Sequence, residues 1–262
     1  MLSAEDPRTL PLLYHINSEP WLNLEAYTDP SHEMQFKRAA AAAGIRSLPR
    51  SRDSSQLRHL MRERRSCRSF TGEALPLSHL AQVLDNAYGV TGLIEEAGSH
   101  RFYARPVPSA GALYPLEIYA ATQSVEDLPD GIYHYAGLDH VLEPVKRGAV
   151  VKGLSELLLG QTFLEDANAA FFLTAVFDRT LRKYGPRGYR YILFEAGHVA
   201  QNICLLAGEL GLATICLGGF VDHRLNEWLT LDGTTEAVVY VVGLGHPRAT
   251  VRAVALDHGT RK

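Results

Sequence analysis

The run from Lys183 to Phe220 constrains the fold more than any other stretch of the chain. From Tyr191 onward its apolar residues recur at steps of three and four, which places them on one face of an α-helix. These residues are Ile192, Leu193, Ala196, Ala200, Ile203, Cys204, Ala207 and Leu210. The stripe is too wide for a solvated surface helix, and its small members allow another helix to approach closely. Gly208 and Gly211 predict where this central core helix ends.

The flanks of this helix carry groups that a purely structural helix does not need. Lys183 and Tyr184 stand before it among several arginines, and the pair Gly218 and Gly219 follows an apolar "TICL" segment after it. Titratable groups at one end and backbone without side chains beyond the other end are typical of the frame of a ligand site. The alternative interpretation is that the Lys-Tyr pair is an ordinary solvated surface feature. The flanks alone do not identify a ligand.

Composition excludes several classes of function. The chain has 262 residues, of which 46% are hydrophobic and 21% charged, as in ordinary globular proteins. The net charge of −3 argues against a general polyanion binder, and no apolar run reaches the roughly 18 to 20 residues of a membrane span. Three cysteines without CxxC spacing and scattered histidines without HExxH predict neither a disulfide nor a metal site. We therefore expect a cytoplasmic protein that binds neither nucleic acid nor a membrane.

The order of the predicted elements indicates an α+β fold. Helices come first, strands cluster in the middle of the chain, and hairpin-type connections outnumber helical crossovers. We expect residues 1–55 to form an N-terminal extension packed on a main domain, residues 56–262. The helix after Ser55 should turn Leu57, Leu60 and Met61 inward. We further predict a helix capped by Ser78 with Leu80, Val83, Leu84 and Ala87 inward, followed by a loop over 89–100. The predicted strands are 116–122, 131–136, 141–145, 170–177 and 236–245. Short helices are expected at 152–159 and around Leu225, Trp228 and Leu229.

The segment "RRSCRSF" is the first candidate binding motif. Arginine offers fixed forks of N–H donors that match phosphate oxygens, and a serine hydroxyl adds a further donor. Arg64, Arg65, Ser66 and Arg68 are therefore candidates to bind one phosphate group. A solvated basic run is the alternative. Nucleic-acid binding is disfavoured because the tract lacks interleaved aromatic residues and the chain is slightly acidic.

The segment "PSAGALYP" is the second candidate. Its small residues let a flat ligand come close to the backbone, and Ser109 offers a hydroxyl group. It is neither a GxGxxG dinucleotide fingerprint nor a phosphate-binding P-loop. Without further information an ordinary tight turn explains it as well.

Taken together, five blocks in this order resemble the nitroreductase superfamily and, within it, the azoline-oxidising branch of SagB type. The blocks are "RRSCRSF", "PSAGALYP", "KYGPRGYRYILFEAGHVAQN", "LGGF" and "GLGHP", and the resemblance spans about residues 57–247. It implies an FMN enzyme with a mainly antiparallel central sheet flanked by helices. It further implies an intertwined homodimer with two flavins at the subunit interface.

The resemblance also implies a role for each candidate residue. It implies that the ribityl phosphate is bound by Arg64, Arg65, Ser66 and Arg68. It implies that a loop from the partner subunit lines the flavin, formed by Pro108, Ser109, Ala110 and Gly111. Gly218 and Gly219 would lie beside the isoalloxazine ring, where no side chain blocks its face. Lys183 and Tyr184 are the implied catalytic pair.

The implied reaction converts a thiazoline or oxazoline ring in a peptide to the aromatic azole. A base removes a ring proton while a hydride leaves the neighbouring carbon for the flavin, which dioxygen then reoxidises. The substrate would be a ribosomal peptide or one carried by an assembly-line synthetase, and a cyclodehydratase would be a partner. Two alternatives remain open: a general NAD(P)H-dependent nitro or quinone reductase on the same fold, and a non-catalytic scaffold partner of a cyclodehydratase.

Overall fold

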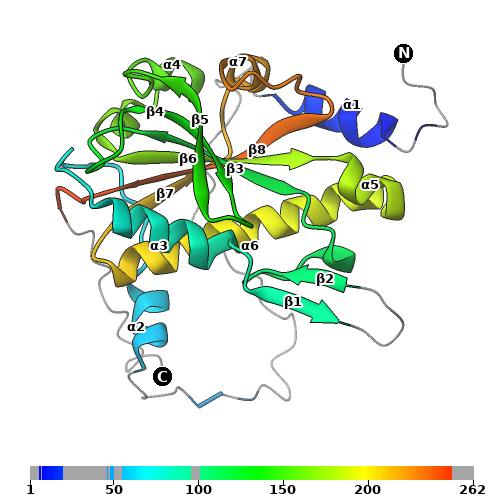
Figure 1. The fold of residues 1–262 in the computed structure, drawn as a ribbon, viewed down its shortest axis with the longest axis horizontal. Helices are drawn as coiled ribbons and strands as arrows, with labels where there is room; N and C mark the ends of the chain where they lie inside the picture. The colour runs from blue at the N-terminus through cyan, green and yellow to red at the C-terminus, as the bar shows by residue number, and fades with distance from the viewer. Residues whose placement is uncertain are drawn as a thin grey trace.

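The computed structural model describes residues 6, 8–19, 46, 48–49, 55–95 and 101–249. These residues form helices on both faces of one large sheet, together with a separate two-stranded ribbon (Figure 1). The helices are α1 (Thr9–Asn17), α2 (Gln56–Glu63), α3 (Leu77–Tyr88), α4 (Leu154–Leu157), α5 (Asp178–Tyr184), α6 (Arg187–Glu209) and α7 (Asp222–Trp228), with 3-10 turns η3 (Ala110–Ala112) and η4 (Thr162–Asp166). The strands are β1 (Gly92–Glu95), β2 (Arg101–Ala104), β3 (Leu116–Thr122), β4 (Gly131–Ala136), β5 (Val141–Arg147), β6 (Ala169–Val176), β7 (Ala213–Leu217) and β8 (Glu236–Gly245).

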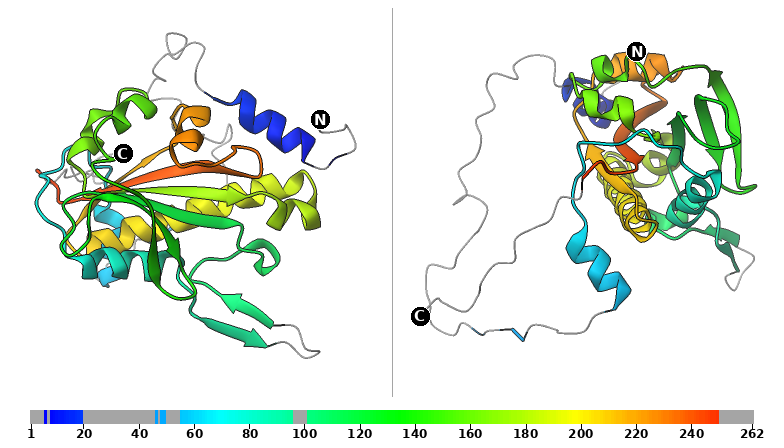
Figure 2. Two further views of the ribbon diagram at one scale, coloured as in Figure 1. Left: turned by 45° about the horizontal axis from the view of Figure 1, so that its top comes forward. Right: turned by 90° about the vertical axis from the view of Figure 1, so that its left-hand side faces the viewer.

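The large sheet has the strand order β5-β4-β3-β6-β8-β7, and every neighbouring pair in it is antiparallel. Helices α3 and α6 cover one face, whereas α4 and α7 lie over the other (Figure 1). The ribbon β1–β2 and helix α2 extend away from this body (Figure 2). The predicted α+β fold with a mainly antiparallel sheet flanked by helices is confirmed.

The central strand β6 explains why the sheet needs helices on both sides. All but the last of its residues are buried, as expected for a continuous apolar run in the middle of a covered sheet. Successive side chains of a strand point to opposite faces. Phe171 therefore packs in the core between the sheet and α3 and α6, and Phe172 packs in the core beneath α4 and α7. The edge strand β5 is mostly exposed and accommodates Pro144, which cannot donate a ladder hydrogen bond.

The predicted central helix is α6, and it begins at Arg187, before the first residue of the apolar stripe. Its buried residues include Ile192, Ala196 and Ile203, which confirms the predicted inward face. Leu193 departs from that prediction because it is partly exposed beside Phe194, whose exposed fraction is 55%. Part of the stripe thus forms an apolar surface on the outside of the chain.

The structure also corrects several local predictions. Residues 89–100 were expected to be a loop, but Gly92–Glu95 in this stretch form β1, which pairs with β2. Ser78 lies inside α3, and Pro76 occupies the N-cap position, where no side chain caps the helix. Helix α2 turns neither Leu57 nor Met61 inward; their exposed fractions are 55% and 56%. The reason is that α2 stands away from the sheet and packs only through a few contacts with α6.

The N-terminal region is described only in part. Residues 9–17 form α1, whose Leu12 joins the core on the α6 side of the sheet. On the same helix, His15 Nδ1 lies 2.9 Å from the hydroxyl oxygen of Tyr189 on α6. Most other residues of the expected extension lie outside the described residues. Within the described part of the chain, no helix has both the length and the apolar character needed to cross a bilayer.

Candidate functional site

Strand β7 connects two of the predicted motifs in space. Ser66 forms a parallel bridge with Thr214 near the start of this strand, and the backbone N–H of Cys67 donates to the Thr214 carbonyl oxygen at 2.9 Å. Gly218 and Gly219 follow directly after the strand ends at Leu217. A strand rises about 3.3 Å per residue, so the four steps from Thr214 to Gly218 span about 13 Å. The arginine segment and the two glycines therefore lie at opposite ends of one edge strand.

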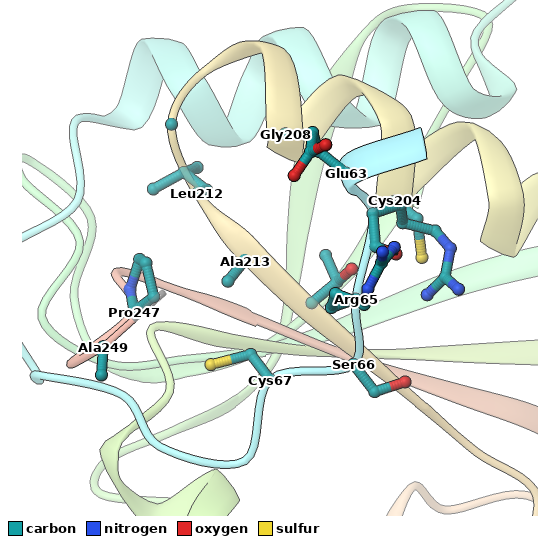
Figure 3. Close-up of a pocket in the computed structure, with 13 residues that line it drawn as sticks. Glu63, Arg65, Ser66, Cys67, Cys204, Gly208, Leu212, Ala213, Pro247 and Ala249 are labelled. Carbon is teal, nitrogen blue, oxygen red and sulfur yellow. The ribbon is translucent and has the colours of Figure 1, made fainter. Parts of the chain in front are cut away.

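A cavity of about 280 Å³ opens beside the arginine segment. Arg64, Arg65 and Ser66 line one side of it, and the turn between α6 and β7 lines another (Figure 3). Ser66 and Cys67 point to opposite sides of the extended segment in this view. The cavity has an acidic member, Glu63, at its edge.

The guanidinium groups of this segment differ in their availability. Arg65 Nη1 donates to the carbonyl oxygens of Arg62 and Arg64 at 2.6 and 2.7 Å. Arg64 and Arg68 are exposed, and among the described residues neither forms a salt bridge with a carboxylate. The two guanidinium groups without a carboxylate partner flank Ser66 along the chain, which makes this segment a candidate anion site.

Two cysteines lie next to this site. Cys204 lines the cavity, and its Sγ atom is 3.6 Å from that of Cys216 on β7; both thiols are free. The hydrogen bond from Cys216 and the positive charge of Arg64 lower the pKa of Cys204 to about 7 against the effect of burial, and the same hydrogen bond raises the pKa of Cys216.

The two glycines at the other end of β7 do not have a backbone conformation that requires glycine, so their effect is to leave the space beside the backbone free of side chains. Neither Gly218 nor Gly219 has a positive φ angle. A Cβ built at Gly218 would come no closer than 4.0 Å to Tyr240, and one at Gly219 would lie 3.1 Å from Leu159. Gly218 is exposed. A flat ligand can therefore approach the backbone at this step.

The loop of residues 108–115 meets the predicted catalytic pair within the same chain. Gly111 has φ +64°, and a Cβ built there would lie 2.7 Å from Lys183 Nζ and 2.8 Å from the hydroxyl oxygen of Tyr184. Both side chains come from the last turn of α5, which the sequence did not indicate as a helix. Lys183 Nζ lies 5.4 Å from the centre of the Tyr184 ring, which packs edge-on against Tyr191 at 5.1 Å. The Lys183 amine and the Tyr184 hydroxyl thus both lie next to the backbone of Gly111, which has no side chain.

Ser109 uses its hydroxyl inside the loop. It accepts a hydrogen bond from the backbone N–H of Tyr114 at 2.9 Å. Its place in the structure indicates that it shapes the loop. Pro108 and Ala110 flank it; neither has a polar side chain.

The candidate residues therefore form two groups at one end of the sheet. Leu116 at the start of β3 is in register with Ala175, which pairs with Ala237 on β8, and Leu217 at the end of β7 pairs with Val241. Three strand spacings, about 14 Å, separate β3 from β7 across the sheet, and Leu217 pairs with β8 four residues beyond the row of Leu116, so the two strand ends are further apart than 14 Å. No atom within 4 Å of a Cβ built at either glycine of the Gly-Gly step belongs to the loop or to α5. Within one chain the two groups do not touch.

Sequence reasoning missed one buried acid in this region. Glu195 lies in the middle of α6 with an exposed fraction of 2%, and its Oε1 accepts a hydrogen bond from the Tyr88 hydroxyl at 2.7 Å. Burial raises the pKa of Glu195, while hydrogen bonds from Ser109 and Tyr88 oppose that effect. The available signal was a carboxylate next to the small residues of an otherwise apolar helix face.

Comparison with known proteins agrees with the family resemblance seen in the sequence. The model of the nitroreductase family matches residues 61–246. MJ1384 of Methanocaldococcus jannaschii, named as a nitroreductase, is 38% identical over 176 residues, covering 67% of this chain and 85% of that protein. The microcin B17-processing protein McbC of Escherichia coli is 34% identical over 146 residues, 54% of each chain, so the match spans about half the length of McbC.

Solved structures agree with these relatives. A chain of the E. coli microcin synthetase McbBCD complex with truncated pro-MccB17 bound matches with a TM-score of 0.66 and 26% identity, over 89% of this chain and 86% of that one. The family model spans the strands of the large sheet, the central helix and both groups of candidate residues. The chain belongs to the nitroreductase family.

Proposed function

We propose that this nitroreductase-family oxidoreductase is an FMN-dependent dehydrogenase that converts a thiazoline or oxazoline in a peptide to the corresponding azole. The observation that carries the proposal is the meeting of Lys183 Nζ and the Tyr184 hydroxyl at the backbone of Gly111. A reductase that only passes a hydride to an acceptor needs no such pair, whereas aromatisation of an azoline also requires removal of a ring proton. The likeness to the microcin B17-processing protein supports a peptide substrate.

The residues present fit FMN. Members of this family typically bind it. Arg64, Ser66 and Arg68 would hold the phosphate, since both guanidinium groups lack a carboxylate partner among the described residues, and Arg64 and Ser66 line the cavity. Gly218 and Gly219 would lie beside the ring, at a distance along β7 that suits one extended cofactor. When bound, FMN would supply the hydride acceptor.

The protein's own part of the reaction is proton transfer and orientation. Lys183 Nζ and the Tyr184 hydroxyl offer two adjacent positions for accepting the ring proton and for holding the substrate through hydrogen bonds. Tyr191 restrains the Tyr184 ring, and the bare backbone of Gly111 leaves both groups uncovered by a loop side chain. Their place at the end of α5 keeps them on a rigid element.

A homodimer would complete the site. In one chain, three strand spacings across the sheet, about 14 Å, separate the strand that follows the loop group from the strand that precedes the glycine group. The outer surface of α6 carries exposed Leu193 and Phe194, and the nearby α2 carries exposed Leu57 and Met61. We expect these apolar faces to pair in the homodimer, so that the loop and the Lys-Tyr pair of one subunit face the glycines of its partner. Exchange of Phe194 for glutamate should then give a monomer that binds FMN poorly, measured by light scattering and flavin content.

The test is a direct assay of the purified, FMN-loaded protein with a short thiazoline peptide. The expected result is a product lighter by two hydrogens, formed in the presence of dioxygen. Lys183→Ala and Tyr184→Phe should abolish or strongly reduce product while FMN stays bound. Arg182→Gln, an exposed cation on the same helix, should not.

Two other outcomes would contradict the proposal. Rapid bleaching of the flavin by NAD(P)H together with nitro or quinone reduction, and no azoline oxidation, would favour the general reductase that the match to MJ1384 also supports. Unchanged azole formation in a reconstituted pathway containing both Arg64→Ala and Lys183→Ala would favour a scaffold role beside a cyclodehydratase or synthetase.

A further inference from the structure

Two cysteines meet where helix α6 runs back along strand β7. The chain reverses direction between Glu209, the last residue of α6, and Ala213, the first residue of β7. Cys204 lies five residues before the end of the helix, about 7.5 Å at 1.5 Å per residue. Cys216 lies three residues after the start of the strand, about 10 Å at 3.3 Å per residue. The two side chains are therefore at similar distances from the turn.

The contact between the two thiols is close. Sγ of Cys204 lies 3.6 Å from Sγ of Cys216, and both thiols are free. The S–S bond of a disulfide is about 2.05 Å long, so the two sulfur atoms need to approach each other by only about 1.5 Å. A buried cysteine can also serve merely as a small apolar side chain, and its reactivity distinguishes the two cases.

The two cysteines differ in their surroundings. Cys204 lines the cavity beside the arginine segment, together with Arg64 (Figure 3). Cys216 packs instead against the core on the α6 side of the sheet. The hydrogen bond from Cys216 and the charge of Arg64 lower the pKa of Cys204, so part of this thiol is ionised near neutral pH. A thiolate that borders a cavity, with a second thiol in contact behind it, is the arrangement that a redox-active pair requires.

We propose that Cys204 and Cys216 form a reversible disulfide when hydrogen peroxide enters the cavity. The Cys204 sulfur attacks one peroxide oxygen, the O–O bond breaks, and water leaves behind a sulfenic acid on Cys204. The Cys216 sulfur then attacks the Cys204 sulfur, so that the S–S bond forms while the S–O bond breaks and a second water leaves. The two thiols together lose two protons and two electrons, and one peroxide is reduced to two waters.

The proposed function would supply this oxidant. Dioxygen that takes up two electrons and two protons from the oxidation of an azoline becomes hydrogen peroxide. Gly218, where the ring of the cofactor would lie, is two residues beyond Cys216, about 7 Å along the strand. This source of peroxide rests on the proposed function, whereas the chemistry of the two thiols does not.

The test counts thiols in the whole chain, with and without FMN, before and after treatment with hydrogen peroxide. The chain has three cysteines, and we expect the count to fall from three to one and to return to three with dithiothreitol. Cleavage after Glu209 separates Cys204 from Cys216, and the two peptides should stay joined until they are reduced. Bound FMN should slow the loss of thiols because it would fill the cavity.

Three variants test the role of each cysteine. In Cys216→Ser, the sulfenic acid on Cys204 has no partner, so dimedone should label Cys204. In Cys204→Ser, peroxide should form no disulfide and dimedone should not label Cys216. Cys67→Ser is the matched control, because Cys67 lines the same cavity but its thiol donates to the carbonyl oxygen of Ser69 at 3.1 Å. This variant should still form the disulfide, and its thiol count should fall from two to none.

Several results would overturn the inference. They are a wild-type chain that keeps three thiols, a disulfide that contains Cys67, a disulfide between two chains, and dimedone on Cys216 in Cys204→Ser without dimedone on Cys204 in Cys216→Ser. The wild-type measurement needs no variant, so it decides if a variant fails to fold.

The failure of this inference can be told apart from the failure of the proposed function. If peroxide joins the two cysteines but FMN gives no protection and no azoline is oxidised, the redox site stands and the proposed function falls. If the protein oxidises an azoline and keeps three thiols in excess peroxide, only the redox site falls.

Discussion

Exchange of Gly111 for alanine tests the core of the proposed site. The added Cβ would lie 2.7 Å from Lys183 Nζ and 2.8 Å from the Tyr184 hydroxyl oxygen, whereas ordinary contact begins near 3.4 Å. Each group must therefore retreat by about 0.6 to 0.7 Å, or the loop must shift by a similar amount. The φ of +64° adds a backbone cost of about 1–2 kcal/mol for a residue with a Cβ.

These magnitudes give two separable expectations. The backbone cost should lower the melting temperature by about 2–8 °C in a domain of this size. The displacement should lower kcat for a thiazoline peptide by about 10- to 100-fold, because errors approaching 1 Å at reacting groups have effects of that order. Thermal unfolding followed by circular dichroism and steady-state kinetics measure the two effects.

Gly153→Ala is the matched control for this variant. Gly153 has φ +86°, and a Cβ built there has no atom within 4 Å. It should lose a similar amount of stability and keep full activity. Equal kcat values for the two variants, with FMN bound in both, would refute the idea that Lys183 and Tyr184 act from their place beside Gly111.

The remaining predictions concern the cofactor site and the dependence on pH. Arg64→Ala should weaken FMN binding by about 10-fold or more, because a charge-assisted hydrogen bond is lost, whereas exposed Lys152→Ala should not; FMN fluorescence titration measures both. Bound FMN should slow alkylation of Cys204, which lines the cavity and whose lowered pKa of about 7 makes the thiol reactive near neutral pH. Mass spectrometry of the alkylated peptide measures the rate; equal rates with and without FMN would contradict the binding of FMN in this cavity. The hydrogen bond to Glu117, aided by Glu143, raises the pKa of His134 to about 8. The protonated His134 should therefore contribute about 1–2 kcal/mol to the free energy of unfolding below pH 6.5, and this contribution should be lost as the pH rises through 8. Urea unfolding of His134→Gln should show no such decrease in the free energy of unfolding over this pH range.

Helices and strands were predictable wherever their buried side produces a regular spacing of apolar residues in the sequence. The inward face of α6 and the strands β3, β6 and β8 agree with their predicted ranges to within a residue or two, because a buried element must repeat apolar residues at its own period. The predicted inward face of α2 was wrong for the same physical reason. Leu57 and Met61 are apolar, but no periodicity states whether the covering surface belongs to the same chain.

Residue chemistry in the candidate site was also readable from the sequence. Arginines beside a serine indicate an anion, and adjacent glycines leave backbone open. The amino-acid sequence by itself determined the family and the fold class. It did not determine which hydrogen bonds the polar side chains form: the Tyr88 hydroxyl donates to Glu195, 107 residues further along the chain.

Only the tertiary structure decided which of these groups meet. Ser66 lies beside Thr214, and Gly111 lies against Lys183, because the antiparallel strand order carries distant segments to common places on the sheet. Such pairings depend on the register between strands that are distant in the sequence, and local periodicity does not predict this register. The separation of the two site groups by three strand spacings follows from the same order.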